Sequence, residues 1–132
     1  MTYRKIDTCI WQDVWFENLQ STGKLAFIYF WSNDYCTQSG IYGMTPKRFH
    51  FDTGLDFEES IQQLSGKVEW NQNEGLIWVK NFFKHQCQNV FFVKAALGSL
   101  SQHNGIKKRF YEYNKIIISG YTGIELGKYG LP

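Results

Sequence analysis

The sequence predicts a mainly α-helical domain with a small β-sheet, and three observations support that expectation. Its 132 residues are 43% hydrophobic and 18% aromatic, which is enough apolar side chain to fill one compact core. Apolar residues recur three and four positions apart in several segments, which is the period of an α-helix. One stretch carries two β-branched and aromatic runs around a turn, which is the pattern of a β-hairpin.

The first third of the chain carries two helical patterns ahead of a short strand. Over 10–19 the three-to-four spacing of apolar residues predicts a short amphipathic helix that lies on the core. The apolar run Leu25–Trp31 follows a Ser-Thr start and predicts a helix that is buried on most sides. After a loop rich in turn-forming residues, 40–44 has the length of one short strand.

Residues 46–65 have the outline of a helix-turn-helix. Thr45 can cap the first helix, and Pro46 suits its first position, where the missing N–H costs nothing. Gly54 tolerates the left-handed conformation that a tight turn between helices requires. Asp56 can cap the second helix. The inward face of that helix then carries an apolar stripe: Phe57, Ile61 and Leu64.

Residues from about 67 to about 83 predict the hairpin. The runs Lys-Val-Glu-Trp and Leu-Ile-Trp-Val-Lys-Asn-Phe-Phe flank Asn-Gln-Asn-Glu-Gly, whose residues favour turns. A hairpin that directly follows a helix-turn-helix, with one more short strand earlier in the chain, is the order of a winged helix. The predicted fold is therefore a winged helix-turn-helix with extra N- and C-terminal helices.

Helical spacing returns after the hairpin, over about 84–115. Two apolar stripes are expected there, one on each of two helices: Val90, Val93, Leu97 and Leu100, then Ile106, Phe110, Tyr113 and Ile117. The remaining stretch, 116–132, is Gly-rich and weakly patterned. We expect one domain over 1–115, and a frayed tail that leads toward a missing C-terminal region.

Several functional classes are disfavoured. The apolar runs fall far short of the roughly 20 residues that cross a bilayer, and the N-terminus lacks a signal-peptide pattern, so we expect a cytoplasmic protein without membrane contact. The three cysteines form no Cys-x-x-Cys pair and predict reduced thiols. His50, His85 and His103 stand outside any metal or catalytic motif. We therefore expect no catalysis, no metal, no cofactor and no small-molecule substrate.

Three short motifs carry a family resemblance: Ser-Gly-Ile-Tyr at 39–42, Thr-Gly-Leu at 53–55 and Asn-Phe-Phe-Lys-His-Gln at 81–86. With their surroundings, over roughly Tyr3 to Phe110, they resemble the N-terminal winged-helix region of phage and prophage replication proteins of Gram-positive bacteria. This is the replisome-organiser or DnaD-like primosome group. The resemblance implies a winged-helix fold in a DNA replication context within a bacterial host cell, and it implies no catalytic residue.

Basic and amide side chains on the predicted motif could line one side of a DNA duplex. Phosphate contacts dominate non-specific DNA binding, and glutamine amides can bond adenine edges. The tyrosines near the basic C-terminal residues also leave single-stranded DNA open as a partner. The candidate DNA-binding residues are Lys47, Arg48, Gln62, Gln63, Lys67, Asn71, Gln72, Lys80 and Lys84.

Three carboxylates, Asp56, Glu58 and Glu59, open the second helix of the motif, where a phosphate-binding helix would be expected to carry lysines. They complement the helix dipole, but they can also bind a basic partner. Residues 67–132 carry nine Lys or Arg against four Asp or Glu, with the densest cluster at Lys107, Lys108 and Arg109. An interaction or self-association module of the replisome is therefore an alternative to DNA binding. A sequence-specific repressor is a third hypothesis.

Overall fold

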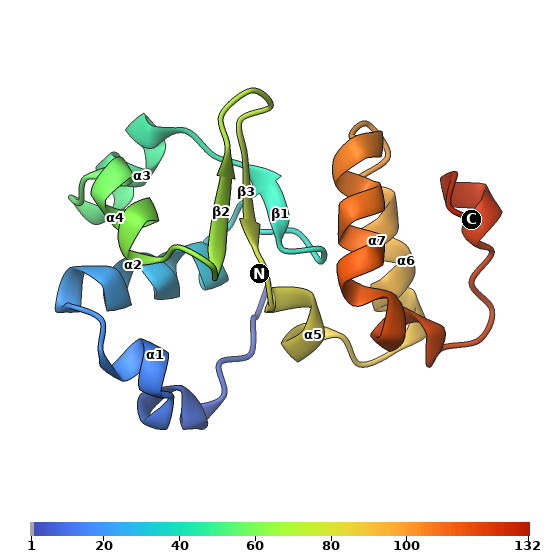
Figure 1. Ribbon diagram of the computed structural model, residues 1–132, viewed down its shortest axis with the longest axis horizontal. Coiled ribbons are helices and arrows are strands. Elements are labelled where there is room, and N and C mark those ends of the chain that lie inside the picture. Colours follow the sequence, from blue (N-terminus) through green and yellow to red (C-terminus); the bar gives the residue numbers. More distant parts are fainter. Residues whose placement is uncertain (1) are drawn as a thin grey trace.

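The computed structural model describes residues 2–132, and it has helices on both faces of a small sheet. Figure 1 shows α2, α3 and α4 on one side of the strands and α6 and α7 on the other. The elements are, in order, η1 (Thr8–Gln12), α1 (Val14–Glu17), α2 (Ser21–Ser32), β1 (Ile41–Gly43), α3 (Pro46–Thr53), α4 (Phe57–Gln63), β2 (Val68–Asn71), β3 (Leu76–Val79), α5 (Phe82–Gln86), α6 (Val90–Ser99), α7 (Asn104–Ser119) and η2 (Leu126–Tyr129). The predicted class, mainly helical with a small sheet, is confirmed.

The sheet has three antiparallel strands in the order β1-β3-β2. Trp78 of β3 lies opposite Ile41 of β1 and Glu69 of β2. All four side chains of β3 are buried, because alternate residues of a strand point to opposite faces and helices cover both faces here. The central strand therefore contributes to two separate hydrophobic cores.

The first core lies between the sheet and the helices α2, α3 and α4. The rings of Phe30 and Phe49 stack with their centroids 4.9 Å apart, and Phe57 meets both of them edge-on. Ile77 and Val79 of β3 complete this core. The apolar run of α2 enters this core through Ala26, Phe27, Phe30 and Trp31, as expected, but Leu25 at its start is 49% exposed.

The second core lies between the opposite face of the sheet and the helices α5, α6 and α7. Trp78 packs there with Phe83, Val93 and Phe110. The C-terminal stretch belongs to the same core, since Leu131 is only 5% exposed. The predicted tail boundary after residue 115 is therefore wrong: α7 continues to Ser119, and the residues beyond it pack back onto the domain.

The turn between α3 and α4 has the predicted chemistry. Thr45 accepts a hydrogen bond from the backbone N–H of Arg48 at 3.0 Å, ahead of Pro46 at the first turn of the helix. Gly54 ends α3 in the left-handed region, with φ at +75°. Asp56 then caps α4 by accepting from the N–H of Glu59 at 2.9 Å. Local sequence signals thus determine where these two helices start and stop.

Two element predictions differ from the structure. The expected helix over 10–19 is split into η1 and α1 by Asp13, whose side chain caps α1 by accepting from the N–H of Phe16. The second hairpin strand ends at Val79 rather than near residue 83, because Phe82 and Phe83 occupy the first turn of α5, where both are fully buried. Aromatic residues suit either structure, so their presence alone could not locate the boundary.

The buried face of α7 is also rotated from the predicted stripe. Ile106 and Phe110 are buried as expected, but Tyr113 is 48% exposed. Tyr111 and Asn114 take its place inside, with Lys107 on the same face. The helix therefore packs on a face centred about one position away from the stripe that the spacing suggested.

The left-handed turn at Gly54 gives the first prediction. A Gly54→Ala substitution should lower the free energy of unfolding by about 1 kcal/mol, because a Cβ disfavours a positive φ. Gly98→Ala is the matched control: Gly98 lies within α6 with open space around it, so alanine there should stabilise by up to about 1 kcal/mol. Urea denaturation of both variants measures the difference, and two changes of the same sign would contradict the assignment.

Candidate nucleic-acid interface

The outer face of α4 is polar and begins with acidic side chains. Phe57 and Ser60 point inward, while Glu58, Glu59 and Gln62 are exposed. One oxygen of the Asp56 carboxylate accepts the capping bond, so the presence of this residue has a structural reason. Gln62 is consequently the exposed amide on α4 that can reach a base edge.

Gln63 does not belong to this outer face, so its predicted orientation is wrong. Its Nε2 donates to the hydroxyl of Thr22 on α2 at 3.2 Å. The side chain fills the space that Gly23 leaves open, and its Oε1 is buried without a hydrogen-bond partner. Positions 60, 63 and 64 share one side of α4, and α2 covers that side. Gln63 therefore joins two helices.

The first turn of α3 presents two exposed cations, Lys47 and Arg48. The Arg48 guanidinium lies 5.5 Å from the ring centroid of Tyr35 and 5.8 Å from that of Phe51. Phe51 is 79% exposed, so the two rings and the guanidinium form an open surface group. This group was not predicted from the sequence, although the three-residue spacing of Arg48 and Phe51 on one helix is a signal for it.

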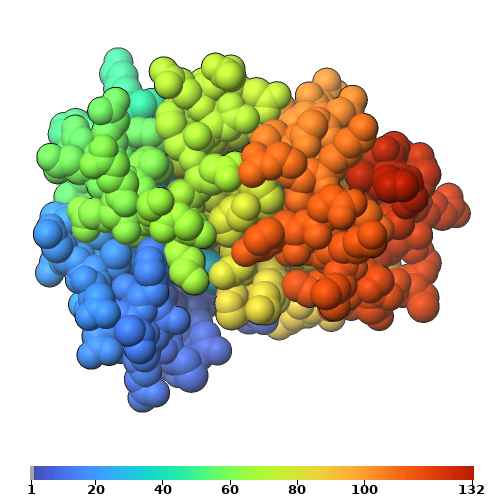
Figure 2. Space-filling model, in the orientation of Figure 1, coloured from blue at the N-terminus to red at the C-terminus, as the bar shows by residue number. Residues whose placement is uncertain are grey.

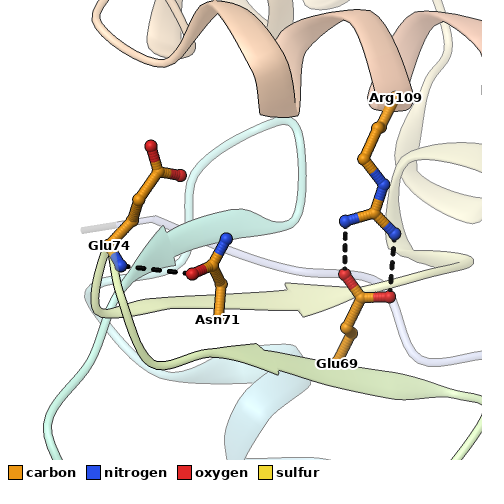
Figure 3. A network of polar contacts seen from close by, with 4 residues as sticks. All are labelled: Glu69, Asn71, Glu74 and Arg109. Carbon is orange, nitrogen blue, oxygen red and sulfur yellow. Dashed lines mark hydrogen bonds and ion pairs between the residues drawn. The ribbon is translucent and has the colours of Figure 1, made fainter.

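This cationic turn lies next to the hairpin loop. The backbone N–H of Met44, just before α3, donates to the carbonyl of Gly75 at 3.1 Å. Gln72 is exposed in the same loop. Asn71 is committed to the turn, because its Oδ1 accepts from the N–H of Glu74 at 3.1 Å (Figure 3). Lys47, Arg48 and Gln72 therefore lie at one end of the sheet.

Lys67 and Lys84 lie at the opposite end of the sheet, where β2 begins and α5 follows β3 (Figure 1). Lys67 is half-buried, with its Nζ 5.6 Å from the ring centroid of Trp15, and Lys84 is exposed. The predicted cations thus form two groups, which are separated by about the length of a four-residue strand, on the order of 13 Å.

Lys80 is turned into the interface between the sheet and α7. Its Nζ lies 3.8 Å from the ring centroid of Trp78 and 4.5 Å from that of Tyr113. Burial lowers the pKa of Lys80, and the nearby carboxylate of Glu69 opposes that shift. The ammonium group is therefore partly buried and engaged with two aromatic rings.

Arg109 is also engaged within the chain. Its guanidinium makes two hydrogen bonds to the Glu69 carboxylate, at 2.7 and 2.9 Å (Figure 3). These bonds are the largest cause of the lowered pKa of Glu69. Lys107 is only 6% exposed, so a positive surface of three residues at 107–109 is not present. Of these three residues, Lys108 is the one that is exposed and also takes part in no ion pair found within residues 2–132.

Over residues 2–132, no group of three His, Cys, Asp or Glu side chains is placed to hold a metal ion. None of the helices in that range has the length and apolar character to cross a membrane. The cysteines are free, and burial raises the pKa of the Cys36 thiol to about 12. A thiol with so high a pKa is a poor nucleophile near neutral pH.

Comparisons of the chain with family models, with curated proteins and with solved structures found no match. Its function must therefore be inferred from the side chains and their geometry. The features that bear on nucleic-acid binding are the exposed face of α4, the cations of α3 and the β2–β3 hairpin.

The pair of Glu69 and Arg109 gives the second prediction. Arg109→Gln should lower the free energy of unfolding at pH 7 by up to about 1 kcal/mol, since the pair is largely exposed. Because the folded-state pKa of Glu69 is lowered, the pair stabilises the fold above the unfolded pKa of the carboxyl group. That stabilisation is lost as the pH falls through the lowered folded-state pKa.

Urea denaturation of both proteins at neutral and at acidic pH checks this expectation. The gap between Arg109→Gln and the unsubstituted protein should narrow in acid. Lys108→Gln, one position away and exposed, is the control and should change stability little at either pH. A gap that stays constant with pH would show that Arg109 acts through packing on Trp78 instead.

Proposed function

We propose that this chain is a DNA-binding domain of the winged-helix type, from a phage-type DNA replication initiation protein, and that it contacts mainly the DNA backbone. The observation that carries the proposal is the order of its elements. The helix α2, strand β1, the pair α3–α4 and the hairpin β2–β3 follow one another, and the strands pair in the order β1-β3-β2. In this assignment, α4 corresponds to the recognition helix, the second helix of the helix-turn-helix, and the β2–β3 hairpin corresponds to the wing.

The distribution of charge favours backbone contacts over base recognition. Lys47 and Arg48 are exposed next to the hairpin loop, where a phosphate strand can pass. Glu58 and Glu59 oppose close approach of the start of α4 to phosphate, and Gln62 is its exposed amide. Binding of this kind is broad in sequence and depends strongly on salt.

The replication context is supported by the sequence resemblance described above. The motifs at 39–42, 53–55 and 81–86 resemble replisome-organiser and DnaD-like proteins, which act in the cytoplasm of bacterial host cells. The first two motifs lie at β1 and at the turn between α3 and α4, and the third opens α5. They therefore lie in or directly beside the elements that the winged-helix assignment uses.

Fluorescence anisotropy with labelled duplex and single-stranded DNA tests the proposal. Affinity should fall by orders of magnitude between about 50 and 200 mM salt, as expected for several phosphate contacts. The double variant Lys47→Gln, Arg48→Gln should weaken binding to all sequences and lower the salt slope by about two. Lys94→Gln, an exposed position on α6, is the matched control and should change neither.

The outcomes separate the hypotheses. No binding at the lower salt concentration would overturn the proposal. Tight, salt-resistant binding to one palindromic site would support a sequence-specific repressor instead. Binding in which the control variant weakens as much as the double variant would show that overall charge matters, rather than the surface at α3.

A second candidate is a protein-interaction or self-association module. It is favoured by Glu58 and Glu59, which are exposed and take part in none of the ion pairs found in residues 2–132. The basic surface that they would meet on a second copy is smaller than the sequence suggested. Lys107 is buried and Arg109 is paired, so Lys108 remains from that cluster.

Replacing both residues, Glu58→Gln and Glu59→Gln, distinguishes the two functions. If the domain binds DNA, the variant should bind it more tightly, because repulsion between carboxylates and phosphates is removed. If the acidic face binds another protein copy, sedimentation should show weaker self-association. Glu112→Gln, exposed on α7, is the control. A variant that changes neither property would limit these carboxylates to supporting the helix start.

A further inference from the structure

A cavity of about 520 Å³ opens beneath the N-terminal segment. Its walls come from that segment, α1, α2 and α5, and Figure 2 shows the surface hollowed between the N-terminal part of the chain and α5. The volume lies in the range of small-molecule sites in proteins. The sequence did not predict it, because its walls come from segments that lie far apart along the chain.

One side of the cavity is aromatic. Trp15, Phe27 and Trp31 line it, and their rings form a continuous series with centroid separations of 5.2 and 5.6 Å. The ring of His85 lies 5.7 Å beyond that of Trp31. Trp15 is half-buried, while Phe27 and Trp31 are each 8% exposed, so a planar ring would stack mainly on Trp15.

The rim carries two cations that are available to a ligand. Lys67 holds its Nζ 5.6 Å from the Trp15 ring centroid, and Lys5 lies on the N-terminal wall. Neither belongs to an ion pair seen among residues 2–132. Ammonium groups beside an aromatic wall can bind an anionic group carried by a ring.

Two carboxylates on the rim provide hydrogen-bond acceptors. Asp7 and Asp13 each use one oxygen to cap a helix, at 2.8 Å from the N–H of Cys9 and at 2.9 Å from the N–H of Phe16. Each carboxylate keeps acceptor capacity for an amino group of a ligand. The bond from the Cys9 N–H lowers the pKa of Asp7, so this acceptor stays ionised at neutral pH.

The N-terminal wall is fixed before any ligand arrives. The amide of the buried Gln86 donates to the carbonyl of Lys5 at 2.6 Å and accepts from its N–H at 3.0 Å. The indole N–H of Trp31 donates to the same carbonyl at 2.7 Å. Because three hydrogen bonds hold this segment, the cavity is preformed and binding costs little ordering of the chain.

We propose that this cavity binds a single nucleotide, with the base on the aromatic wall, its amino group toward the carboxylates and its phosphate at Lys5 and Lys67. A nucleotide combines the three features that the lining requires: a planar ring, amino donors and an anionic group. The same chemistry is offered by a free mononucleotide and by an unpaired nucleotide within single-stranded DNA. The inference does not depend on duplex binding.

The chain contains five tryptophans, and the indole N–H signals of the two that line this cavity, Trp15 and Trp31, report on it in two-dimensional NMR. Each signal is assigned by a Trp→Phe substitution. Titration with deoxyadenosine monophosphate should shift the signals of Trp15 and Trp31, while Trp78, in the other core, should not respond. Deoxyadenosine should bind more weakly, and inorganic phosphate alone should leave the Trp15 and Trp31 signals in place.

Variants then test the assigned contacts. Lys5→Gln and Lys67→Gln should each weaken binding of the mononucleotide by about tenfold, the loss expected for one charge-assisted hydrogen bond. Lys94→Gln is the matched control and should bind as the unsubstituted protein does. The spectrum of each variant shows whether it is folded, and the two lysines test the same phosphate contact independently.

Every outcome bears on the inference. A short deoxyadenosine oligonucleotide that binds much more tightly than the mononucleotide would support a site for single-stranded DNA, and equal affinities would support a site for the free nucleotide. Absence of indole shifts with either ligand, or equal binding by all three lysine variants, would overturn the proposal. If the unsubstituted protein bound no duplex in the anisotropy experiment but still showed the indole shifts, the duplex function would be overturned and the nucleotide site would be retained.

Discussion

Burial of β3 on both faces is the constraint on which the rest of the structure depends. Ile77 and Val79 belong to the core under α2, α3 and α4, while Leu76 and Trp78 belong to the core under α6 and α7. A strand in this position cannot shift its register by one residue, because each side chain would then face the wrong core. The hairpin loop, the start of α3 and the position of α7 all follow from where this strand lies.

Local chemistry in the sequence was sufficient to predict the helix pair and the hairpin. Thr45, Gly54 and Asp56 act through neighbours within three or four residues, so their roles could be inferred without the fold. The orientation of Gln63 and the burial of Lys107 could not, because both depend on which helix packs on which face. Spacing gives the period of a helix but does not determine which of two adjacent faces is buried.

In the candidate site, too, local features could be predicted from the sequence, while contacts between distant segments could not. The exposed residues Lys47, Arg48 and Gln62 were identified from the sequence because short polar segments outside an apolar stripe face water. The pairing of Arg109 with Glu69 joins residues 40 positions apart, and the bonds between Lys5 and Gln86 span 81 positions. Contacts at such separations leave no periodic signal in the sequence. The reduced basic surface on α7 and the aromatic cavity could therefore be recognised only in the three-dimensional structure.

The contact between the β2–β3 hairpin and α7 also bears on motion. Glu69 holds Arg109, and Lys80 lies between Trp78 of the sheet and Tyr113 of the helix. These contacts couple the base of the hairpin to α7, so motion of one element there is expected to be accompanied by motion of the other. A displacement of the hairpin base would therefore be felt first by α7, through Arg109 and Tyr113.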